Sequence, residues 1–252
     1  MNGSSLLAPT IERQVSELNI LSYPVSVEEG YARWAATYDQ TPNPLLALEL
    51  RCLPPLLPKV AGKHVIDLAC GTGRWLEKLV AAKPATAIGI DLSADMLAIA
   101  HQKPAITGRL VKADCLQLPL ASNVFDLAIC SFAVEHIVNL SEVAPRWSRV
   151  LKENADLFIT GLHPTAISDG WRVGFRDGRG SAQIDSTPHS IKEMATAFRG
   201  AGFQLLHTQE CCLGEPERPL FALAGKERSF DAARKIPAIV ILHFRRHSRR
   251  KF

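Results

Sequence analysis

Three aspartates and a glycine turn are the residues of this chain best placed to do chemistry. Asp67 precedes the turn Gly71–Gly73, and Asp91 and Asp114 follow at similar intervals. Each acid stands at or near the end of an apolar run typical of a strand. A single acid in such a place is usually only solvated. Because parallel strands end at one edge of a sheet, three acids in register with a glycine turn predict a binding site along that edge.

The glycine turn lies between a strand pattern and a helix pattern. The run VIDLACGTG is apolar and then rich in glycine, and Trp75, Leu76, Leu79 and Val80 follow at helical spacing. Glycines allow a ligand to approach the backbone, and the free N–H groups of a helix N-terminus attract negative charge. The segment is therefore typical of a nucleotide site.

A nicotinamide dinucleotide is the first alternative for this site. Its fingerprint is G-x-G-x-x-G, whereas the chain reads G-T-G-R-W-L from Gly71, so Leu76 replaces the third glycine. The carboxylate of Asp67 would repel a pyrophosphate and attract an ammonium group. The sequence therefore favours a cationic nucleoside without phosphate, with Asp91 accepting hydrogen bonds from the ribose hydroxyls. Asp114 would then meet the amino group of a purine.

The elements that must position these residues alternate regularly along the chain. Ser93 and Ser141 are the expected N-caps of two helices. This alternation predicts an α/β fold with a doubly wound, mostly parallel, Rossmann-like sheet of seven strands, with an antiparallel edge pair and an N-terminal helical lid. The expected strands are 64–69, 85–91, 108–114, 125–132, 155–162, 203–209 and 237–246, and the expected helices between them are 74–82, 94–102, 141–151 and 189–200.

We interpret residues 1–252 as a single domain in four parts. The expected parts are a helical lid (1–60), a cofactor-binding core (61–162), a substrate-side insertion (163–188) and a C-terminal sheet edge (189–252). The lid contains an aromatic stripe at helical spacing, from Tyr31 to Tyr38, which either packs on the core or closes a pocket. The insertion is rich in Gly, Asp and Arg and is expected to be an irregular flap. A second irregular stretch is expected at 210–236.

Composition limits the classes of partner. The net charge is +4, but the last eight residues, RRHSRRKF, hold five basic residues, and the remaining 24 basic and 25 acidic residues give −1. A solvated tail is favoured, although a contact with nucleic acid or anionic lipid stays open. The six cysteines show no metal spacing, and the chain has no run of 18 apolar residues. We expect a cytoplasmic protein without a membrane span or metal site, as a monomer or homodimer.

Four segments carry a resemblance to a known family. VIDLACGTG, GIDLS, KADCLQLPLASNVFDLAICSFAVEHI and YARWAATYD resemble class I S-adenosylmethionine-dependent methyltransferases, in the UbiE/BioC-like branch called methyltransferase type 11. The resemblance covers roughly residues 28–162. It implies S-adenosylmethionine as the cofactor.

The resemblance also implies roles for individual residues. Ala69 stands where many members have glycine, a small departure. The implied cofactor contacts are Asp67, Ala69, Gly71 and Gly73 around the methionyl part, Asp91 at the ribose, Leu92 and Met96 at the adenine, Asp114 and Cys115 at its amino group, Ser131 and Phe132 at the sulfonium, and Tyr31 and Tyr38 closing the pocket.

Three histidines are candidates for removing a proton from the methyl acceptor. A neutral histidine can do this near pH 7. His163 is the first candidate because it follows a strand and opens the insertion, and His136 is the second. Glu135, beside it, would orient a base or the substrate, and His189 begins a later helix. A structural role stays open for each histidine.

The acceptor is the least determined part of the reading. Methyltransferases that act on nucleic-acid amines carry an Asn/Asp-Pro-Pro-aromatic loop after the fourth strand, where this chain reads SFAVEHI. We therefore expect a small-molecule acceptor and no nucleic acid. By analogy with the family, methylation is expected at oxygen or carbon of an aromatic, quinone-like or other metabolite. Two alternatives stay open: an RNA methyltransferase that uses the basic tail, and a non-catalytic S-adenosylmethionine-binding protein.

Overall fold

The computed structural model describes residues 22–247, in which a seven-stranded sheet has the order β4-β3-β2-β5-β6-β10-β9. Only β10 runs against its neighbours β6 and β9, so the expected mostly parallel sheet with an antiparallel edge pair is confirmed. Its strands are β2 (His64–Leu68), β3 (Thr86–Asp91), β4 (Leu110–Lys112), β5 (Phe125–Ser131), β6 (Leu151–Leu162), β9 (Phe203–Cys212) and β10 (Pro237–Arg246).

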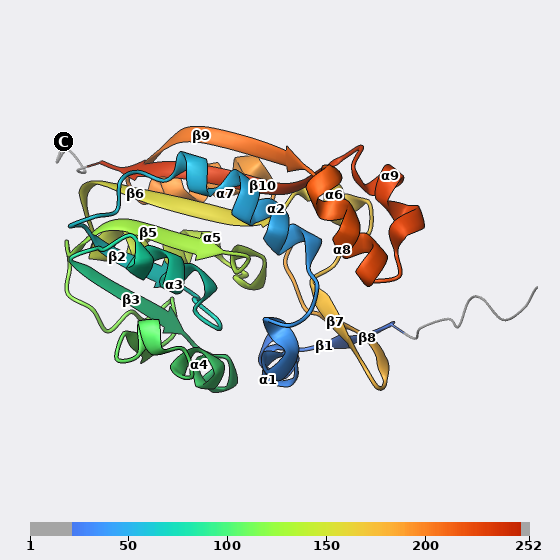
Figure 1. The fold of residues 1–252 in the computed structure, drawn as a ribbon. Coiled ribbons are helices and arrows are strands. Elements are labelled where there is room, and N and C mark those ends of the chain that lie inside the picture. Colours follow the sequence, from blue (N-terminus) through green and yellow to red (C-terminus); the bar gives the residue numbers. More distant parts are fainter. Residues whose placement is uncertain (1–21, 248–252) are drawn as a thin grey trace, which may run out of the picture.

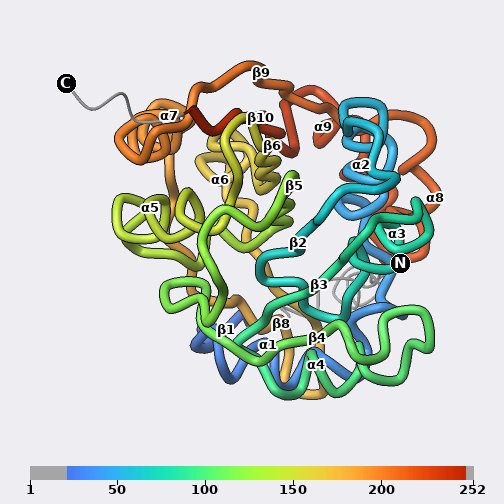
Figure 2. The backbone as a smooth tube through the Cα atoms, turned by 90° about the vertical axis from the view of Figure 1, so that its left-hand side faces the viewer, coloured from blue at the N-terminus to red at the C-terminus, as the bar shows by residue number. Residues whose placement is uncertain are grey.

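Helices cover both faces of this sheet (Figure 2). One core layer lies under α5 and α7, around Trp147 and Phe198, and the other under α2 and α3, around Leu48 and Trp75. The covering helices are α2 (Pro44–Cys52), α3 (Arg74–Ala81), α4 (Ala94–His101), α5 (Leu140–Val150) and α7 (Ile191–Gly200).

Local sequence explains where these helices begin. Ser93 caps α4 as expected, with its hydroxyl accepting from Met96 N at 3.2 Å. The expected cap Ser141 is wrong, because Asn139 Oδ1 accepts from Ser141 N at 3.0 Å and α5 begins one residue earlier. Strand β6 begins at Leu151, four residues before the expected start, since α5 leads into it without a loop. Strand β4 is shorter than expected and ends before Asp114.

The N-terminal part consists of β1 (Ser22–Val25), α1 (Val27–Tyr38) and α2. Ser26 caps α1, and Pro44 occupies the first turn of α2, where its missing N–H costs nothing. Strand β1 differs from the sequence prediction, which gives a helical lid at 1–60 and no strand there. The first 21 residues of the expected lid lie outside the described residues.

The expectation of an irregular flap at 163–188 is wrong. The segment forms α6 (Pro164–Ser168) and a hairpin of β7 (Gly174–Asp177) and β8 (Gly180–Ile184), which pairs with β1 in a sheet of order β1-β8-β7. One face of this small sheet is buried against α1 through Phe175 of β7 and the alternate residues Ala182 and Ile184 of β8. Figure 1 shows α1 and the small sheet beside the carboxyl ends of the parallel strands.

The second stretch expected to be irregular, 210–236, is partly helical. It carries α8 (Arg218–Leu223) and α9 (Phe230–Ala233), whose Phe221 and Phe230 are buried in the core. Short 3₁₀ turns complete the fold at η1 (Pro54–Leu56), η2 (Pro104–Ile106), η3 (Val134–His136), η4 (Glu215–Glu217) and η5 (Glu227–Ser229).

The basic tail belongs partly to the last strand. Arg245 contacts Asp156 at 2.7 Å, and Arg246 donates to Asn123 at 2.8 Å. Residues 248–252 lie outside the described residues. No helix between residues 22 and 247 is long and apolar enough to cross a membrane. The division of the chain into four parts stays a prediction.

Candidate functional site

The glycine turn after β2 has a backbone that only glycine adopts without strain. Gly71 and Gly73 have φ angles of +54° and +78°, and a Cβ atom on Gly73 would lie 2.3 Å from Ile106 Cδ1. Ala69, which departs from the family pattern, also has a positive φ of 55°. This left-handed backbone is the physical reason why glycine suits position 69.

Asp91 joins the glycine turn to the next strand end. Its Oδ2 accepts from Gly71 N at 2.7 Å and its Oδ1 from Ser93 N at 2.8 Å. Burial raises the pKa of Asp91, and these backbone N–H groups partly offset the shift. Each oxygen keeps a lone pair for a further donor, so the two ribose hydroxyls predicted from the sequence have acceptors available.

Two buried polar atoms of opposite charge lack partners beside the turn. Asp67 is 1% exposed and its Oδ2 has no hydrogen-bond partner, nor has Arg74 Nη1. Burial raises the pKa of Asp67 to about 8, although the nearby Arg74 guanidinium opposes the shift. Buried polar groups are normally paired, so these two atoms suit a ligand with a cationic and an anionic end.

Asp67 makes the stability of the ligand-free protein depend on pH. Its folded pKa of about 8 exceeds its ordinary value of 3.8, so its contribution is present at low pH and is lost as pH rises towards 8. The loss amounts to at most about 1.4 kcal/mol per pH unit in this window. His136, whose pKa burial lowers, acts in the opposite direction below its ordinary pKa of 6.5.

We therefore expect the melting temperature of Asp67→Asn to rise relative to that of the natural protein as the pH increases from 5 to 8. Thermal unfolding of both proteins across this range measures the difference between their melting temperatures. Because His136 is present in both proteins, its contribution cancels in this difference. A difference that stays constant with pH would contradict the raised pKa of Asp67.

The buried carboxylate of Glu49 organises the floor of the site. It is fully buried on α2 and accepts from Ser131 Oγ at 2.7 Å and from Trp75 Nε1 at 3.0 Å. It also pairs with Arg74 Nη2 and accepts from the hydroxyl of Thr160. Sequence reasoning missed Glu49 and Arg74. The signals were an isolated acid inside the apolar run LLALELRCL and a basic residue directly after the glycine turn.

The remaining residues predicted for the cofactor lie around the same edge. Leu92 is 63% exposed, and the Met96 methyl group lies against Gly71. Asp114 uses Oδ1 to accept from Leu116 N at 2.8 Å. Burial raises the pKa of the Cys115 thiol, which lies by the backbone of Ala69, to about 12. The structure thus brings these positions together, and their individual roles stay predictions.

Helix α1 closes over this edge. Its Tyr31 hydroxyl lies 2.9 Å from His136 Nε2, while Nδ1 of that ring lies 2.9 Å from the carbonyl oxygen of Asp185. Since a carbonyl only accepts, Nδ1 carries the proton, and Tyr31 donates to Nε2 of a neutral imidazole. Burial raises the pKa of Tyr31 and, to about 12, that of Tyr38.

The C-terminal end of α1 reaches the glycine turn itself. Asp39, which follows Tyr38, accepts from the Thr72 hydroxyl at 2.6 Å and pairs with Lys103 at 2.8 Å. The helix therefore contacts both the glycine turn and His136, on the two sides of the site.

His163 and His189 make structural contacts. His163 is buried and caps α6, with Nδ1 accepting from Thr165 N at 3.0 Å, and its Nε2 lies 3.1 Å from Glu210 Oε2 on the outer strand β9. The ring of His189 donates from Nε2 to the carbonyl of Ile137 at 2.8 Å. The catalytic roles predicted for His163 and His136 are not tested by these contacts and stay predictions.

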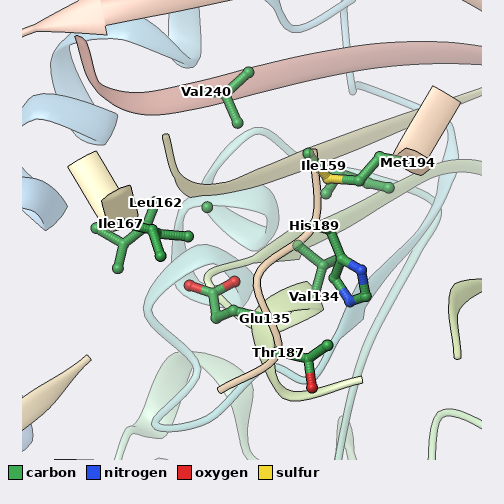
Figure 3. A pocket seen from close by; sticks show the side chains of 10 residues that line it. Val134, Glu135, Ile159, Leu162, Ile167, Thr187, His189, Met194 and Val240 are labelled. Carbon is green, nitrogen blue, oxygen red and sulfur yellow. The ribbon is translucent and has the colours of Figure 1, made fainter. Parts of the chain in front are cut away.

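A narrow cavity lies at the carboxyl ends of β5 and β6, beside the amino end of the antiparallel strand β10 (Figure 3). Glu135 points into it, and most of the surrounding side chains are apolar. Residues 185–190 cover one side, where Thr187 N donates to the carbonyl of Glu135 at 2.7 Å. The lining residues are Val134, Glu135, Ile159, Gly161, Leu162, Ile167, Thr187, His189, Met194 and Val240.

Comparison with known proteins tests the family. A family model described as a methyltransferase domain matches residues 65–154. A demethylmenaquinone methyltransferase of Lactiplantibacillus plantarum is 33% identical in an alignment 179 positions long, which covers 60% of this chain and 74% of the relative. The chain belongs to the class I S-adenosylmethionine-dependent methyltransferases.

Two further matches cover different shares of the proteins compared. A ubiquinone/menaquinone biosynthesis C-methyltransferase of Syntrophotalea carbinolica is 38% identical over 101 residues, which are 38% of this methyltransferase and 42% of that protein. An S-adenosylmethionine-dependent methyltransferase of Mesorhizobium loti shares the fold with a TM-score of 0.64 at 21% identity. It matches over 81% of this chain and 100% of its own.

The unpartnered atoms of the methyltransferase fit its cofactor. S-adenosylmethionine carries an ammonium and a carboxylate on one carbon, and Asp67 and Arg74 offer one buried atom of each opposite charge. The family membership predicted from the sequence is confirmed.

Proposed function

We propose that this methyltransferase transfers a methyl group from S-adenosylmethionine to oxygen or carbon of a small, largely apolar metabolite, of the aromatic or quinone-like class. One observation supports this acceptor best: the narrow, mostly apolar cavity at the carboxyl ends of β5 and β6, with a single carboxylate directed into it. Such a space admits one small group of an acceptor and has no room for a polynucleotide. The printed names of the quinone methyltransferase relatives agree with that class.

Residues along the sheet edge would hold the cofactor. Asp91 is positioned for the ribose hydroxyls, Asp67 for the ammonium group and Arg74 for the carboxylate. Bound S-adenosylmethionine supplies an electrophilic methyl group, so the protein contributes alignment and exclusion of water. Helix α1 supports exclusion because Tyr31 and Tyr38 are both partly buried beside the site.

Two finer points belong to the same proposal. We place the enzyme in a reducing compartment such as the cytoplasm, supported by six free cysteines, of which Cys70, Cys130 and Cys211 are buried. We also assign no role to the basic tail in acceptor binding, because Arg245 and Arg246, the two of its Arg and Lys residues that the structure describes, contact Asp156 and Asn123.

Calorimetric titration with S-adenosylmethionine, its demethylated product and NAD tests the cofactor. We expect both methionyl nucleosides to bind and NAD to show no heat of binding. A methyl-transfer screen over phenols, hydroquinones, hydroxy acids and total RNA then tests the acceptor. Transfer to RNA alone would overturn the small-molecule proposal, and cofactor binding without transfer to any acceptor would favour a non-catalytic binding protein.

The Tyr31–His136 hydrogen bond gives a further expected result. Since His136 links α1 to the segment that covers the cavity, His136→Ala should lower turnover at least tenfold with cofactor affinity within about threefold. His163→Ala, which removes a helix cap near β9, should reduce thermal stability by about 1 kcal/mol and alter turnover less. Initial rates measure the turnover of both variants, and calorimetry measures their affinity for the cofactor. The opposite ranking of turnover would restore His163 as the preferred proton acceptor.

A further inference from the structure

We propose that Glu135 is the group that takes the proton from the methyl acceptor, and that the acceptor is an apolar ring bearing a hydroxyl. The inference rests on the proposed function and extends it to the acceptor side of the site. It assigns the cavity as the place where the hydroxyl is held.

The first argument is the state of the carboxylate. Glu135 is 4% exposed, and neither of its oxygens has a hydrogen-bond partner. Burying an unpaired carboxylate costs free energy, so such a group in a core indicates an interaction that offsets this cost. A ligand that donates a hydrogen bond would supply what the surrounding protein does not.

The second argument is the shape and chemistry of the cavity. It has room for about one water molecule, which is the size of a hydroxyl group. In Figure 3 the carboxylate of Glu135 is directed towards the side of Leu162 and Ile167. One oxygen, Oε2, lies 3.1 Å from where a Cβ atom on Gly161 would stand, so only glycine leaves it open there. An apolar wall with one acceptor selects an apolar body with one donor.

The third argument is that the neighbouring histidine is already engaged. His136 donates from Nδ1 to Asp185 and accepts from Tyr31 with Nε2, so its lone pair is used. His189 directs Nε2 at the carbonyl of Ile137. Glu135 therefore offers carboxylate oxygens to which no protein side chain donates, although the backbone N–H groups of Glu135 and Leu162 partly oppose the rise of its pKa.

The choice of a hydroxyl over an amine follows from charge. A carboxylate beside an ammonium group stabilises its protonated form, which has no lone pair to accept a methyl group. A hydroxyl, in contrast, transfers its proton to Glu135: the acceptor O–H bond breaks, a new O–H bond forms at the carboxylate, and the electron pair remains on the acceptor. The carboxylate becomes a neutral acid and later releases the proton to water.

The electrostatic surroundings suit this exchange. Burial raises the pKa of Glu135 to about 7, near the pH at which general bases work best. The titratable groups that face it are His136 on its own turn, His189 on the covering segment, Tyr31 and Tyr38 on α1, and Glu49 on α2.

The test compares the natural protein with Glu135→Gln, using 2-naphthol as the hydroxyl-bearing probe. We expect methyl transfer to 2-naphthol to fall about 10²–10³-fold, with S-adenosylmethionine affinity changed less than twofold. The rate of the natural protein should rise with pH around 7, and this rise should vanish in the variant. Without acceptor or cofactor, the melting temperature of Glu135→Gln should rise relative to that of the natural protein as the pH increases from 5 to 8.

Glu153→Gln, an exposed glutamate near the start of β6, is the matched control and should behave as the natural protein. Equal rates and equal pH profiles for Glu135→Gln and the natural protein would overturn the role of Glu135. Failure of 2-naphthol to bind either protein would overturn the assigned acceptor class. In both cases unchanged cofactor binding would leave the proposed methyltransferase function standing, whereas loss of cofactor binding in the natural protein would remove that function itself.

Discussion

Asp91→Ala is expected to weaken S-adenosylmethionine binding by about 10²–10³-fold. In the natural protein the Asp91 carboxylate accepts from Gly71 N and Ser93 N and is the acceptor assigned to the ribose hydroxyls. Hydrogen bonds to a charged group contribute about 1.5–3 kcal/mol each, and each 1.4 kcal/mol is tenfold in affinity. The substitution also releases the glycine turn, so the cofactor would meet a less ordered backbone.

Calorimetry with S-adenosylmethionine measures this loss, and circular dichroism confirms that the variant is folded. Asp95→Ala removes an exposed acid from the first turn of α4, four residues away, and serves as the matched control. It should bind within about twofold of the natural protein. If Asp91→Ala bound as tightly as Asp95→Ala, the assignment of Asp91 to the ribose would be wrong.

Glu49→Ala is expected to lower the free energy of unfolding by about 3–5 kcal/mol. The substitution leaves the Arg74 guanidinium as a buried charge without its carboxylate and removes the acceptor of Ser131, Thr160 and Trp75. Breaking a buried ion pair by removing one partner costs this much because the remaining charge stays desolvated. For a protein of this size the melting temperature should fall by about 10 °C.

Chemical denaturation with urea measures the change directly. Glu28→Ala, an exposed acid in the first turn of α1, is the control and should change stability by no more than about 1 kcal/mol. A second expectation separates stability from binding. Saturating S-adenosylmethionine should raise the melting temperature of the natural protein more than that of Glu49→Ala, because the variant no longer orients Arg74. Equal stability of Glu49→Ala and Glu28→Ala would contradict the network.

Much of the central sheet was predictable because its signals are local. A buried parallel strand must be apolar along its length, a helix that covers it must be apolar every three or four residues, and Gly71 and Gly73 mark the connection between them. Asp91 could be placed for the same reason, since the end of a strand fixes the edge of the sheet. The residues predicted for the cofactor accordingly lie near one another.

The contacts that could not be predicted join segments far apart in the chain. Glu49 meets Ser131 and Thr160 across 82 and 111 positions, and no local pattern reports such a pairing. Strand β1 is four residues long and pairs with β8, formed by a hairpin that looked irregular because its Gly and Asp residues make the turn. His163 was preferred from its place after a strand, but place alone does not show that Nδ1 caps α6.

The small sheet and α1 form one mechanical unit. Strand β1 leads directly into α1 and pairs with β8, and Arg33 of α1 binds Asp177 at the end of β7. Strand β8 in turn continues into residues 185–190, which cover the acceptor cavity. If α1 moved away from the glycine turn, these contacts would carry the cover of the cavity with it. We therefore expect the sites proposed for cofactor and acceptor to open together.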